Sequence, residues 1–429
     1  MQIDSVVCAF CGCDCDDIQI TIENDRITQA KNACVLGKAW FMGHSQPQTL
    51  PMARVDGKAV PLEEAVEKAA RILTGARYPI LYGLSSTSCE AQRQAIALTE
   101  AIGGTIDCCT SVCHGPSGMA FQGIGEPTST LGEVKNRADL IIYWGSNPAE
   151  SHPRHMARYA VTARGKFIPN GRKDRTVVMV DVRPTPSARA ADIFLQIAPG
   201  KDFEVLWALR ALVKGFKVEA ESLAGTGISL EQLSDLAERM KNCRFGAFFI
   251  GQGLTQTKGK HMNTGATFLL TRDLNSYTKF VLIPMRGHGN VTGIDSVLAW
   301  QTGYPFGVNF SRNYPRFNPG EFTMVDVLSR GEADAALIIA SDPFANLPET
   351  VRSRLRQIPT IALDTHESET TCIANVAFNT ATAGINVDGT VYRMDNIPLP
   401  LTKLLPSQYP SDEEVLQRIL ARAKELKPC

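Results

Sequence analysis

Short apolar runs that do not alternate with polar residues recur along most of the chain, and each run ends in Gly, Ser, Asn or Asp. Amphipathic helical stretches lie between most of them, as at residues 62–73 and 203–215. Apolar runs separated by helices are typical of parallel strands that are covered on both faces. The pattern therefore predicts an α/β fold with two doubly wound sheets. The runs lie at residues 79–86, 139–148, 176–185, 246–253, 279–287, 335–343 and 360–368.

The first 50 residues have a different pattern. The segment IQITIEND alternates apolar and polar positions, and RITQAKNA continues after a turn at Asn24 and Asp25. We expect short strands here, with a boundary at Pro47 and Pro51.

The ends of the apolar runs predict a binding site. In open α/β sheets, ligands bind at the carboxyl ends of the strands. These ends read GSNP, DVRPT, GQG, MRGHGN, SDP and DTHESET, so they are rich in glycine and small polar residues. Any single one is explained by an ordinary turn. Together they favour a large nucleotide-like cofactor, because glycine lets the backbone approach a phosphate or a flat ring.

Size and charge narrow the class of protein. A chain of 429 residues exceeds one ordinary core. With 44 basic and 44 acidic residues, nothing favours a nucleic-acid or membrane-surface partner. No apolar run approaches the ~20 residues that span a bilayer, and the first residues do not read as a secretory signal. We therefore expect a cytoplasmic protein without membrane insertion.

Five of the twelve cysteines crowd into the first 34 residues. Cys8, Cys11 and Cys15 follow the spacing C-x2-C-x3-C, and Cys34 comes 18 residues later. Three close thiolates with a distant fourth suit a [4Fe–4S] cluster, whereas zinc sites more often use two close pairs. A structural zinc site and unliganded cysteines are the alternatives, and by spacing alone Cys13 can replace a neighbour.

Three further positions carry candidate chemistry. Lys38 is either a surface lysine or a cation between the cluster and a cofactor. Cys113 and His114 stand in an irregular loop, where a thiolate beside an imidazole suits metal ligation and proton transfer; a buried cysteine and a satisfied histidine are the alternative. Arg286 ends an apolar run, where it can bind an anion or form an ordinary salt bridge.

The motifs together resemble the molybdopterin oxidoreductases of the dimethyl sulfoxide reductase and formate dehydrogenase type. Within that family, the short chain, its end soon after GTVYRMDNIPLPL and the cysteine motif CAFCGCDC resemble most the formylmethanofuran dehydrogenase B subunits. The motifs occur in the order that the family uses: CAFCGCDC with CVLGK, SVCHGPSG, YWGSNPAESHPR, VDVRPTPSARAAD, APGKD, GQGLTQTKG, MRGHGNVTGID, ASDPFANLPE and ETTCIANVAFNTA.

The resemblance implies a fold and a division into domains. We expect a small β-rich iron–sulfur domain at residues 1–54, joined by part of 373–429. An α/β domain of 55–110 and 289–372 would receive an inserted α/β domain of 111–288. The carboxyl-terminal barrel domain of longer relatives is expected to be lacking and to have its counterpart in a separate subunit.

The resemblance also implies roles for single residues. Cys113 matches the protein ligand of tungsten or molybdenum, and His114 and Arg286 match the pair beside that metal. Lys38 matches the basic residue between cluster and pterin. The [4Fe–4S] ligands are matched by Cys8, Cys11, Cys15 and Cys34. Loops for one molybdopterin guanosine dinucleotide are matched by Gly145, Asn147, Asp181, Arg183, Asp202, Gly251 and Gly253. Loops for the second are matched by Ser341, Asp342, Asp364 and Thr370.

The activity that the resemblance implies is reversible two-electron reduction of carbon dioxide to formate. Expected partners are a metallo-hydrolase A subunit, a C subunit, a pterin-domain D subunit and ferredoxin-like electron-transfer subunits. The catalytic subunit of an ordinary formate dehydrogenase is an alternative. A non-redox scaffold of a formyltransferase/hydrolase complex is the alternative from another class.

Overall fold

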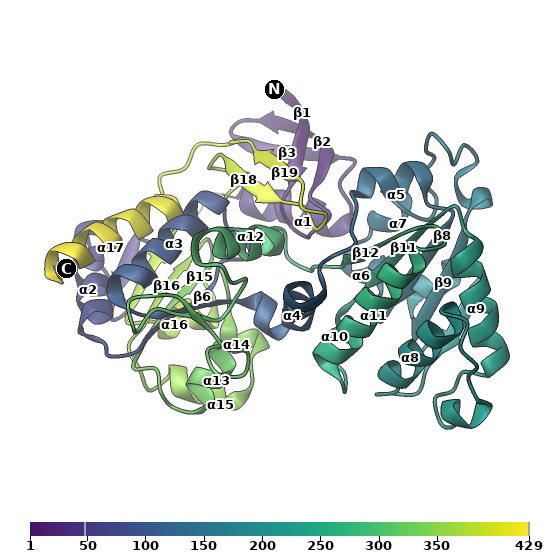
Figure 1. The fold of residues 1–429 in the computed structure, drawn as a ribbon. Helices are drawn as coiled ribbons and strands as arrows, with labels where there is room; N and C mark the ends of the chain where they lie inside the picture. Colours follow the sequence, from purple (N-terminus) through teal and green to yellow (C-terminus); the bar gives the residue numbers. More distant parts are fainter. Residues whose placement is uncertain (47–48, 428–429) are drawn as a thin grey trace. The chain divides into compact units, whose positions relative to one another are not determined.

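The computed structural model describes residues 1–46 and 49–427, so the predicted boundary residue Pro47 lies outside the described residues. The chain forms two compact units (Figure 1). The first comprises Met1–Ser111, His288–Arg393 and Pro398–Cys429, and the second comprises Val112–Gly287 and Met394–Ile397. None of the helices in the described part of the chain has the length and hydrophobicity that crossing a lipid bilayer requires.

The main sheet of the first unit has the strand order β14-β13-β7-β6-β15-β16-β17-β4-β5. Its central strands β7, β6, β15, β16 and β17 are parallel, and short antiparallel strands extend both edges. The bounds are β4 (Ala53–Val55), β5 (Lys58–Ala59), β6 (Pro79–Gly83), β7 (Thr105–Cys108), β13 (Val308–Asn309), β14 (Arg316–Phe317), β15 (Ala335–Ile339), β16 (Thr360–Asp364) and β17 (Val376–Asn379).

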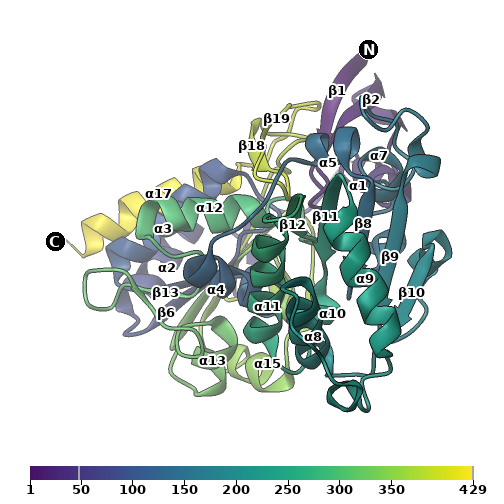
Figure 2. The ribbon, with the colours of Figure 1, turned by 45° about the vertical axis from the view of Figure 1, so that its right-hand side comes forward.

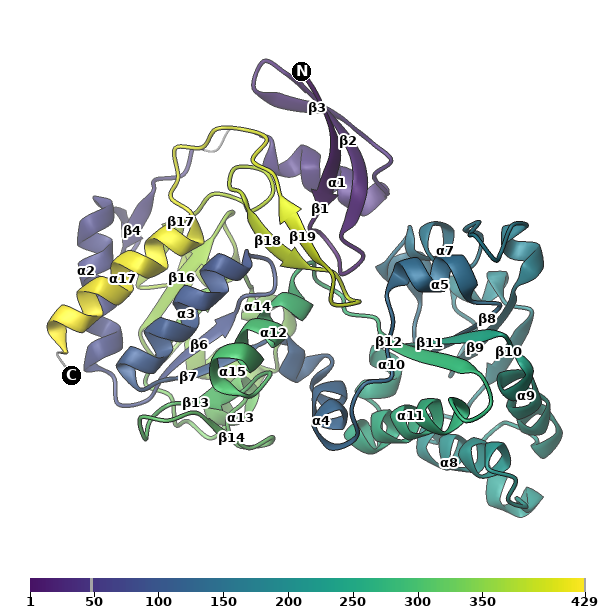
Figure 3. The same ribbon diagram turned by 45° about the horizontal axis from the view of Figure 1, so that its top comes forward.

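Helices of this unit pack together beside the sheet. Helix α17 (Asp412–Leu426) lies along α2 (Leu62–Gly75) and α3 (Cys89–Ile102), as Figure 3 shows. Helix α2 turns Ala65, Val66 and Leu73 inward. Each Å² of apolar surface that is buried in this way stabilises the fold by ~25 cal/mol. Other helices of the unit are α1 (Val35–His44), α12 (Val291–Thr302), α13 (Met324–Ser329), α14 (Pro343–Asn346), α15 (Glu349–Leu355) and α16 (Glu369–Ile373).

Two small antiparallel sheets complete the first unit. The cysteine-rich amino terminus forms β1 (Gln2–Cys8), β2 (Cys15–Glu23) and β3 (Arg26–Lys31). Strands β18 (Gly389–Tyr392) and β19 (Pro398–Leu401) pair near the carboxyl terminus. Strand β1 contacts β19, so segments from the two ends of the chain pack together.

The second unit contains one parallel sheet in the order β10-β9-β8-β11-β12 (Figure 2). The strands are β8 (Leu140–Trp144), β9 (Thr176–Asp181), β10 (Ile193–Gln196), β11 (Phe245–Ile250) and β12 (Lys279–Pro284). The helices are α4 (Gly115–Ile124), α5 (Leu131–Arg137), α6 (Pro148–Ser151), α7 (His155–Arg158), α8 (Asp202–Val213), α9 (Leu230–Asn242), α10 (Gln252–Thr255) and α11 (Lys260–Leu274).

Alternation along the strands gives this sheet two buried faces. Leu140, Ile142 and Trp144 join the hydrophobic core that α8, α9 and α11 cover. On the neighbouring position of the same strand, Tyr143 stacks on Phe249 with ring centroids 5.2 Å apart. Burial on both faces is why these strands read as unbroken apolar runs.

All seven runs that the sequence predicted as strands are strands, and all lie in the parallel parts of the two main sheets. The predicted α/β class is therefore confirmed. The cysteines outside the clusters differ in burial. Cys89 is buried, whereas Cys372 is exposed, because the short helix α16 turns Thr370 and Thr371 inward instead.

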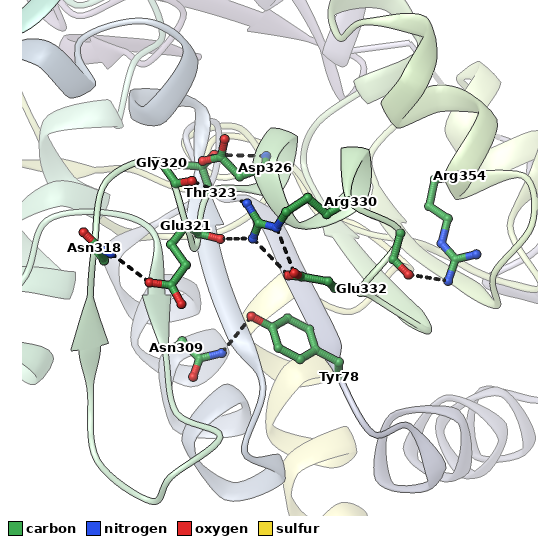
Figure 4. A network of polar contacts seen from close by, with 11 residues as sticks. Tyr78, Asn309, Asn318, Gly320, Glu321, Thr323, Asp326, Arg330, Glu332 and Arg354 are labelled. Atoms are coloured by element: carbon green, nitrogen blue, oxygen red, sulfur yellow. Dashed lines mark hydrogen bonds and ion pairs between the residues drawn. The ribbon is translucent and has the colours of Figure 1, made fainter.

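Polar contacts fix the long loop before α13 to the sheet of the first unit (Figure 4). Arg330 donates to Glu332 at 2.8 and 2.9 Å and also to the carbonyl oxygen of Glu321. Asn309 donates to the hydroxyl of Tyr78 at 3.1 Å. These contacts stabilise this edge of the sheet and the segments beside it.

Candidate functional site

Cys113 lies in the turn between a short 3-10 helix (Cys109–Val112) and α4. Its backbone is held by the segment that follows β11. The carbonyl oxygen of Cys113 accepts hydrogen bonds from the Thr255 hydroxyl at 2.7 Å and from Nε2 of Gln256 at 2.8 Å. Two donors on one carbonyl fix the peptide, while the side chain of Cys113 stays only half-buried. Thr255 and Gln256 belong to the motif GQGLTQTKG, but the sequence gave no sign of this contact, because it spans more than 140 residues.

His114 follows at the start of α4 and is fully buried. Its Nε2 lies 3.1 Å from the carbonyl oxygen of Met285, and its Nδ1 lies 3.3 Å from the hydroxyl of Ser117. Because a carbonyl only accepts, Nε2 carries the proton and Nδ1 accepts from Ser117. Burial, and then the positive charge of Arg286, lower the pKa of His114 to about 3. The imidazole is therefore neutral, with both nitrogens engaged by protein groups.

Arg286 stands two residues after β12 with a relative exposure of 4%. Its guanidinium lies 5.9 Å from the ring centroid of Phe121. Its carbonyl oxygen accepts a hydrogen bond from Nε2 of His152 at 2.7 Å. Burial lowers the pKa of His152 to about 4, so this imidazole is also neutral. His114 and His152 thus hold the adjacent carbonyls of Met285 and Arg286.

His152 was missed as a site residue, although it belongs to the motif YWGSNPAESHPR. Its place in that motif was the one weak sign of a role in the site. Only the structure pairs it with a carbonyl 134 residues away. The two imidazoles therefore fix the backbone that carries the buried Arg286 side chain.

Three predicted glycines bring two strand ends of the second unit into contact. Gly253 donates its N–H to the carbonyl of Gly145 at 2.9 Å. A Cβ on Gly145 would lie 2.5 Å from the backbone nitrogen of Leu254, and one on Gly251 would lie 2.3 Å from the carbonyl oxygen of Gly145. Glycine is therefore required here by the close approach of two loops. The loops from Gly145 and Gly251 and the Cys113 turn form one connected group.

The polar residues predicted for the same cofactor end neighbouring strands. Asn147 accepts from the hydroxyl of Ser187 at 2.6 Å, which links the loops after β8 and β9. Asp202 is buried at the start of α8 and accepts from Nε1 of Trp144 at 2.8 Å. Burial raises the pKa of Asp181 and that of Asp202, and the charge of Asp181 adds to the effect on Asp202. Arg183 is exposed beyond β9.

A second polar group lies at the strand ends of the first unit. Asp342 accepts from the hydroxyl of buried Thr370 at 2.6 Å. Burial raises the pKa of Asp364 to about 7, and the charges of Asp412 and Asp342 contribute. Ser341 lies against Gly83: a Cβ added to Gly83 would lie 2.9 Å from the Cβ of Ser341. Enclosed carboxyls at strand ends can recognise a donor-rich heterocycle such as a guanine base.

The amino-terminal cysteines gather at the loop end of the β1–β2 hairpin. Cys8 and Cys15 are direct cross-strand partners, and Cys11 and Cys13 lie in the loop between them. All four are buried. The Cys13 thiol donates to the Cys11 sulfur, which raises the pKa of Cys13 and lowers that of Cys11. Cys13 therefore lies in contact with Cys11, which spacing does not reveal.

Cys34 is the N-cap of α1, where its Sγ accepts from the N–H of Gly37 at 3.4 Å. A Cβ on Gly37 would lie 2.9 Å from Sγ of Cys8 and 3.8 Å from Sγ of Cys34. Helix α1 thus brings the distant cysteine to the hairpin cysteines, and the missing side chain keeps the space between them open. Lys38 follows one turn on and is exposed.

The segment after Arg286 packs on the cysteine loop. His288 forms a β-bridge with Cys11, and a Cβ on Gly289 would lie 2.0 Å from the carbonyl oxygen of Ala9. Within the described residues, no three His, Cys, Asp or Glu side chains are arranged as ligands of a single metal ion. The hairpin cysteines together with Cys34 supply four thiols from neighbouring segments, and thiolates are the ligands of iron–sulfur clusters.

Comparison with known proteins gives the family. Residues 51–383 match the model of the molybdopterin oxidoreductase family. The chain is 47% identical to the B subunit of the tungsten-containing formylmethanofuran dehydrogenase 2 of Methanocaldococcus jannaschii, over 99% of each chain. It is 27% identical to formate dehydrogenase H of Escherichia coli, over 70% of this chain and 48% of that one.

A solved structure of the formyltransferase/hydrolase complex FhcABCD from Methylorubrum extorquens, bound to methylofuran, has a chain with the same fold. The TM-score is 0.71 at 25% identity, covering 87% of this chain and 99% of that one. The chain therefore belongs to the molybdopterin oxidoreductase family, and within it to the tungsten-containing formylmethanofuran dehydrogenase B subunits.

Proposed function

We propose that this chain catalyses the reversible reduction of carbon dioxide to formate, which supplies formate for formylmethanofuran synthesis. The reaction consumes two electrons and one proton: CO2 + 2 e⁻ + H⁺ gives HCOO⁻. The observation that carries the proposal is the group formed by Cys113, His114 and Arg286. A half-buried thiol, a neutral imidazole and a buried guanidinium lie in one unit, at the carboxyl ends of its strands.

The donor set suits a metal-bound pterin. Cys113 offers one soft sulfur ligand. Beside it, two loops meet at Gly145 and Gly251, which carry no side chains that would cover their backbone. A tungsten or molybdenum ion with two molybdopterin guanosine dinucleotides would supply the two-electron chemistry when bound. The loops after β8, β9 and β11 would hold one dinucleotide. Asp342, Asp364 and Thr370 would help to hold the other.

Arg286 would bind the carboxylate of formate and stabilise the negative charge that develops on carbon dioxide. Its planar fork suits two oxygen atoms on one carbon. Low exposure strengthens this interaction, because little water screens it.

His114 is the predicted proton carrier. Since both its nitrogens are engaged in this structure, it can move a proton only after the Ser117 or Met285 contact opens. Otherwise its role is to keep Met285, and with it Arg286, in place.

Electrons would reach this site through a [4Fe–4S] cluster held by Cys8, Cys11, Cys15 and Cys34, with Lys38 between cluster and pterin. Ferredoxin-like subunits would deliver them. A metallo-hydrolase A subunit would condense formate with methanofuran, and the C and D subunits would complete the complex. Support comes from the relatives, which are named as subunits of such complexes.

The test uses the purified native complex and a viologen dye as electron carrier. Formate oxidation and carbon dioxide reduction are compared between wild type and Cys113→Ser. The exposed Cys372→Ser serves as the matched control, because it changes the same atoms at a position that is not a predicted ligand. We expect loss of at least ~10³-fold for Cys113→Ser and none for the control. Equal rates for the two variants would overturn the proposal.

Two rivals make different predictions. If the chain belonged to an ordinary formate dehydrogenase, the purified enzyme would interconvert formate and carbon dioxide, but it would not form formylmethanofuran when methanofuran is added. A non-redox scaffold, which the likeness to the formyltransferase/hydrolase complex favours, would contain neither iron nor tungsten or molybdenum. Elemental analysis of the purified complex separates the scaffold from both redox enzymes.

A further inference from the structure

The second unit carries a groove at the amino ends of its strands. The lining of the groove comes from α5 and from the starts of β11 and β12, and its volume is about 400 Å³. The Cys113 turn lies at the opposite, carboxyl ends of the strands. Strands of five or six residues separate these two ends of the sheet by ~17–20 Å. An occupant of this groove therefore does not contact the candidate redox site. The lining residues are Glu133, Arg137, Phe167, Arg244, Phe245 and Lys279.

The groove combines an aromatic wall with a cationic rim. Phe167 is 44% exposed, which is unusual for a large apolar side chain. The guanidinium of Arg137 lies 4.6 Å from its ring centroid, and the ammonium of Lys166 lies 5.5 Å from it. The Phe167 ring is thus held between two cations at the protein surface.

The rim has more positive than negative charge. Arg137 pairs with Glu133 at 2.6 Å, and Arg244 pairs with Asp139 at 3.1 Å. Lys166 and Lys279 are exposed, and neither forms an ion pair within the described residues. The surplus of two cations beside an apolar wall calls for an occupant that is both acidic and partly apolar.

We propose that this groove is a docking site for an acidic segment of a partner subunit, which inserts an apolar side chain beside Phe167. A buried small-molecule site is not favoured, because the charges stand on an exposed rim and exposed charges act on orientation and association rate. The inference rests on the proposal that the chain works as one subunit of a complex. It does not depend on the redox chemistry.

The first arm of the test is zero-length coupling of amines to carboxylates in the purified native complex, followed by mass spectrometry. Lys166 and Lys279 are expected to couple to Asp or Glu side chains within one short segment of another subunit. Coupling of both lysines only within this chain or to a second copy of it would overturn the proposal, as would no coupling while other exposed lysines react.

The second arm uses a double variant, Phe167→Ala with Lys279→Glu. Retention of the cross-linked subunit during purification in moderate salt is expected to fall about tenfold or more. The matched control is Phe216→Ala with Lys214→Glu, an exposed pair on the same unit that is expected to leave retention unchanged. Equal retention by both double variants would overturn the proposal. Viologen-linked formate oxidation by the wild-type preparation reports separately on the redox site.

Discussion

The hydroxyl of Thr255 lies 2.7 Å from the carbonyl oxygen of Cys113, and both groups belong to the second unit. Thr255 is fully buried, so this contact is not exchanged with water. It connects the proposed metal ligand to the loop after β11, whose glycines face the proposed pterin. Thr255, which belongs to the motif GQGLTQTKG but was not predicted as a site residue, is therefore expected to position the metal ligand.

Replacing Thr255 with Val keeps the shape and removes the donor. Loss of a hydrogen bond worth ~1 kcal/mol predicts a fall in kcat for formate oxidation of about fivefold. The electron paramagnetic resonance signal of the metal is expected to change as well, because Cys113 shifts. Thr255→Ser restores the donor and should restore both readouts. A Val variant with wild-type rate and signal would show that the contact is only structural.

The His152–Arg286 contact predicts an effect on substrate binding. His152→Phe fills the space but leaves the carbonyl oxygen of Arg286 without this donor, which costs ~1–3 kcal/mol. If Arg286 binds the carboxylate, KM for formate should rise roughly tenfold with a smaller change in kcat.

His261→Phe serves as the control for this variant, because His261 is exposed on α11. It should leave KM unchanged. A His152→Phe enzyme that loses kcat at unchanged KM would contradict the assignment of Arg286 to substrate binding.

Gly37 tests the cysteine site. Gly37→Ala places a Cβ 2.9 Å from Sγ of Cys8, whereas Gly43→Ala on the same helix meets nothing within 4 Å. Both changes raise helix propensity equally. We expect lower iron content and a weaker reduced-cluster signal for Gly37→Ala alone. Equal iron content in the two variants would contradict a cluster between Cys8 and Cys34.

Asp364 predicts a dependence of stability on pH. Burial raises its pKa in the folded chain to about 7, above the ordinary value of 3.8. The unfolded chain therefore ionises first, so this carboxyl destabilises the fold progressively as pH rises from about 4 to about 7. Asp364→Asn should raise the Tm of the cofactor-free chain at pH 8 and have little effect at pH 4.

The same variant should retain less guanosine dinucleotide in the complex, because an amide loses the acceptor pair of a carboxylate. Asp25→Asn, in an exposed turn, is the matched control. A Tm difference that does not vary between pH 4 and pH 8 would contradict the enclosed, raised-pKa carboxyl.

The strands were predictable because burial on both faces leaves a local signal that needs no partner to be read. The glycines at the strand ends were also predicted as site residues, but the sequence does not show why they must be glycine. Gly145 and Gly251 are required because their loops contact each other. The roles of His152, Thr255 and Gln256 could not be predicted although all three lie in the family motifs, since each acts through a backbone carbonyl more than 130 residues away. By spacing, Cys13 could replace one of the predicted ligands, whereas its contact with Cys11 depends on the geometry of the loop.

The most direct test of the redox assignment is X-ray absorption at the metal edge of the purified complex, measured for wild type and Cys113→Ser. If Cys113 binds the metal, tungsten or molybdenum in the variant has one sulfur neighbour fewer and carbon dioxide reduction is lost. A variant whose metal has the wild-type sulfur environment would contradict the assignment of Cys113 as the metal ligand.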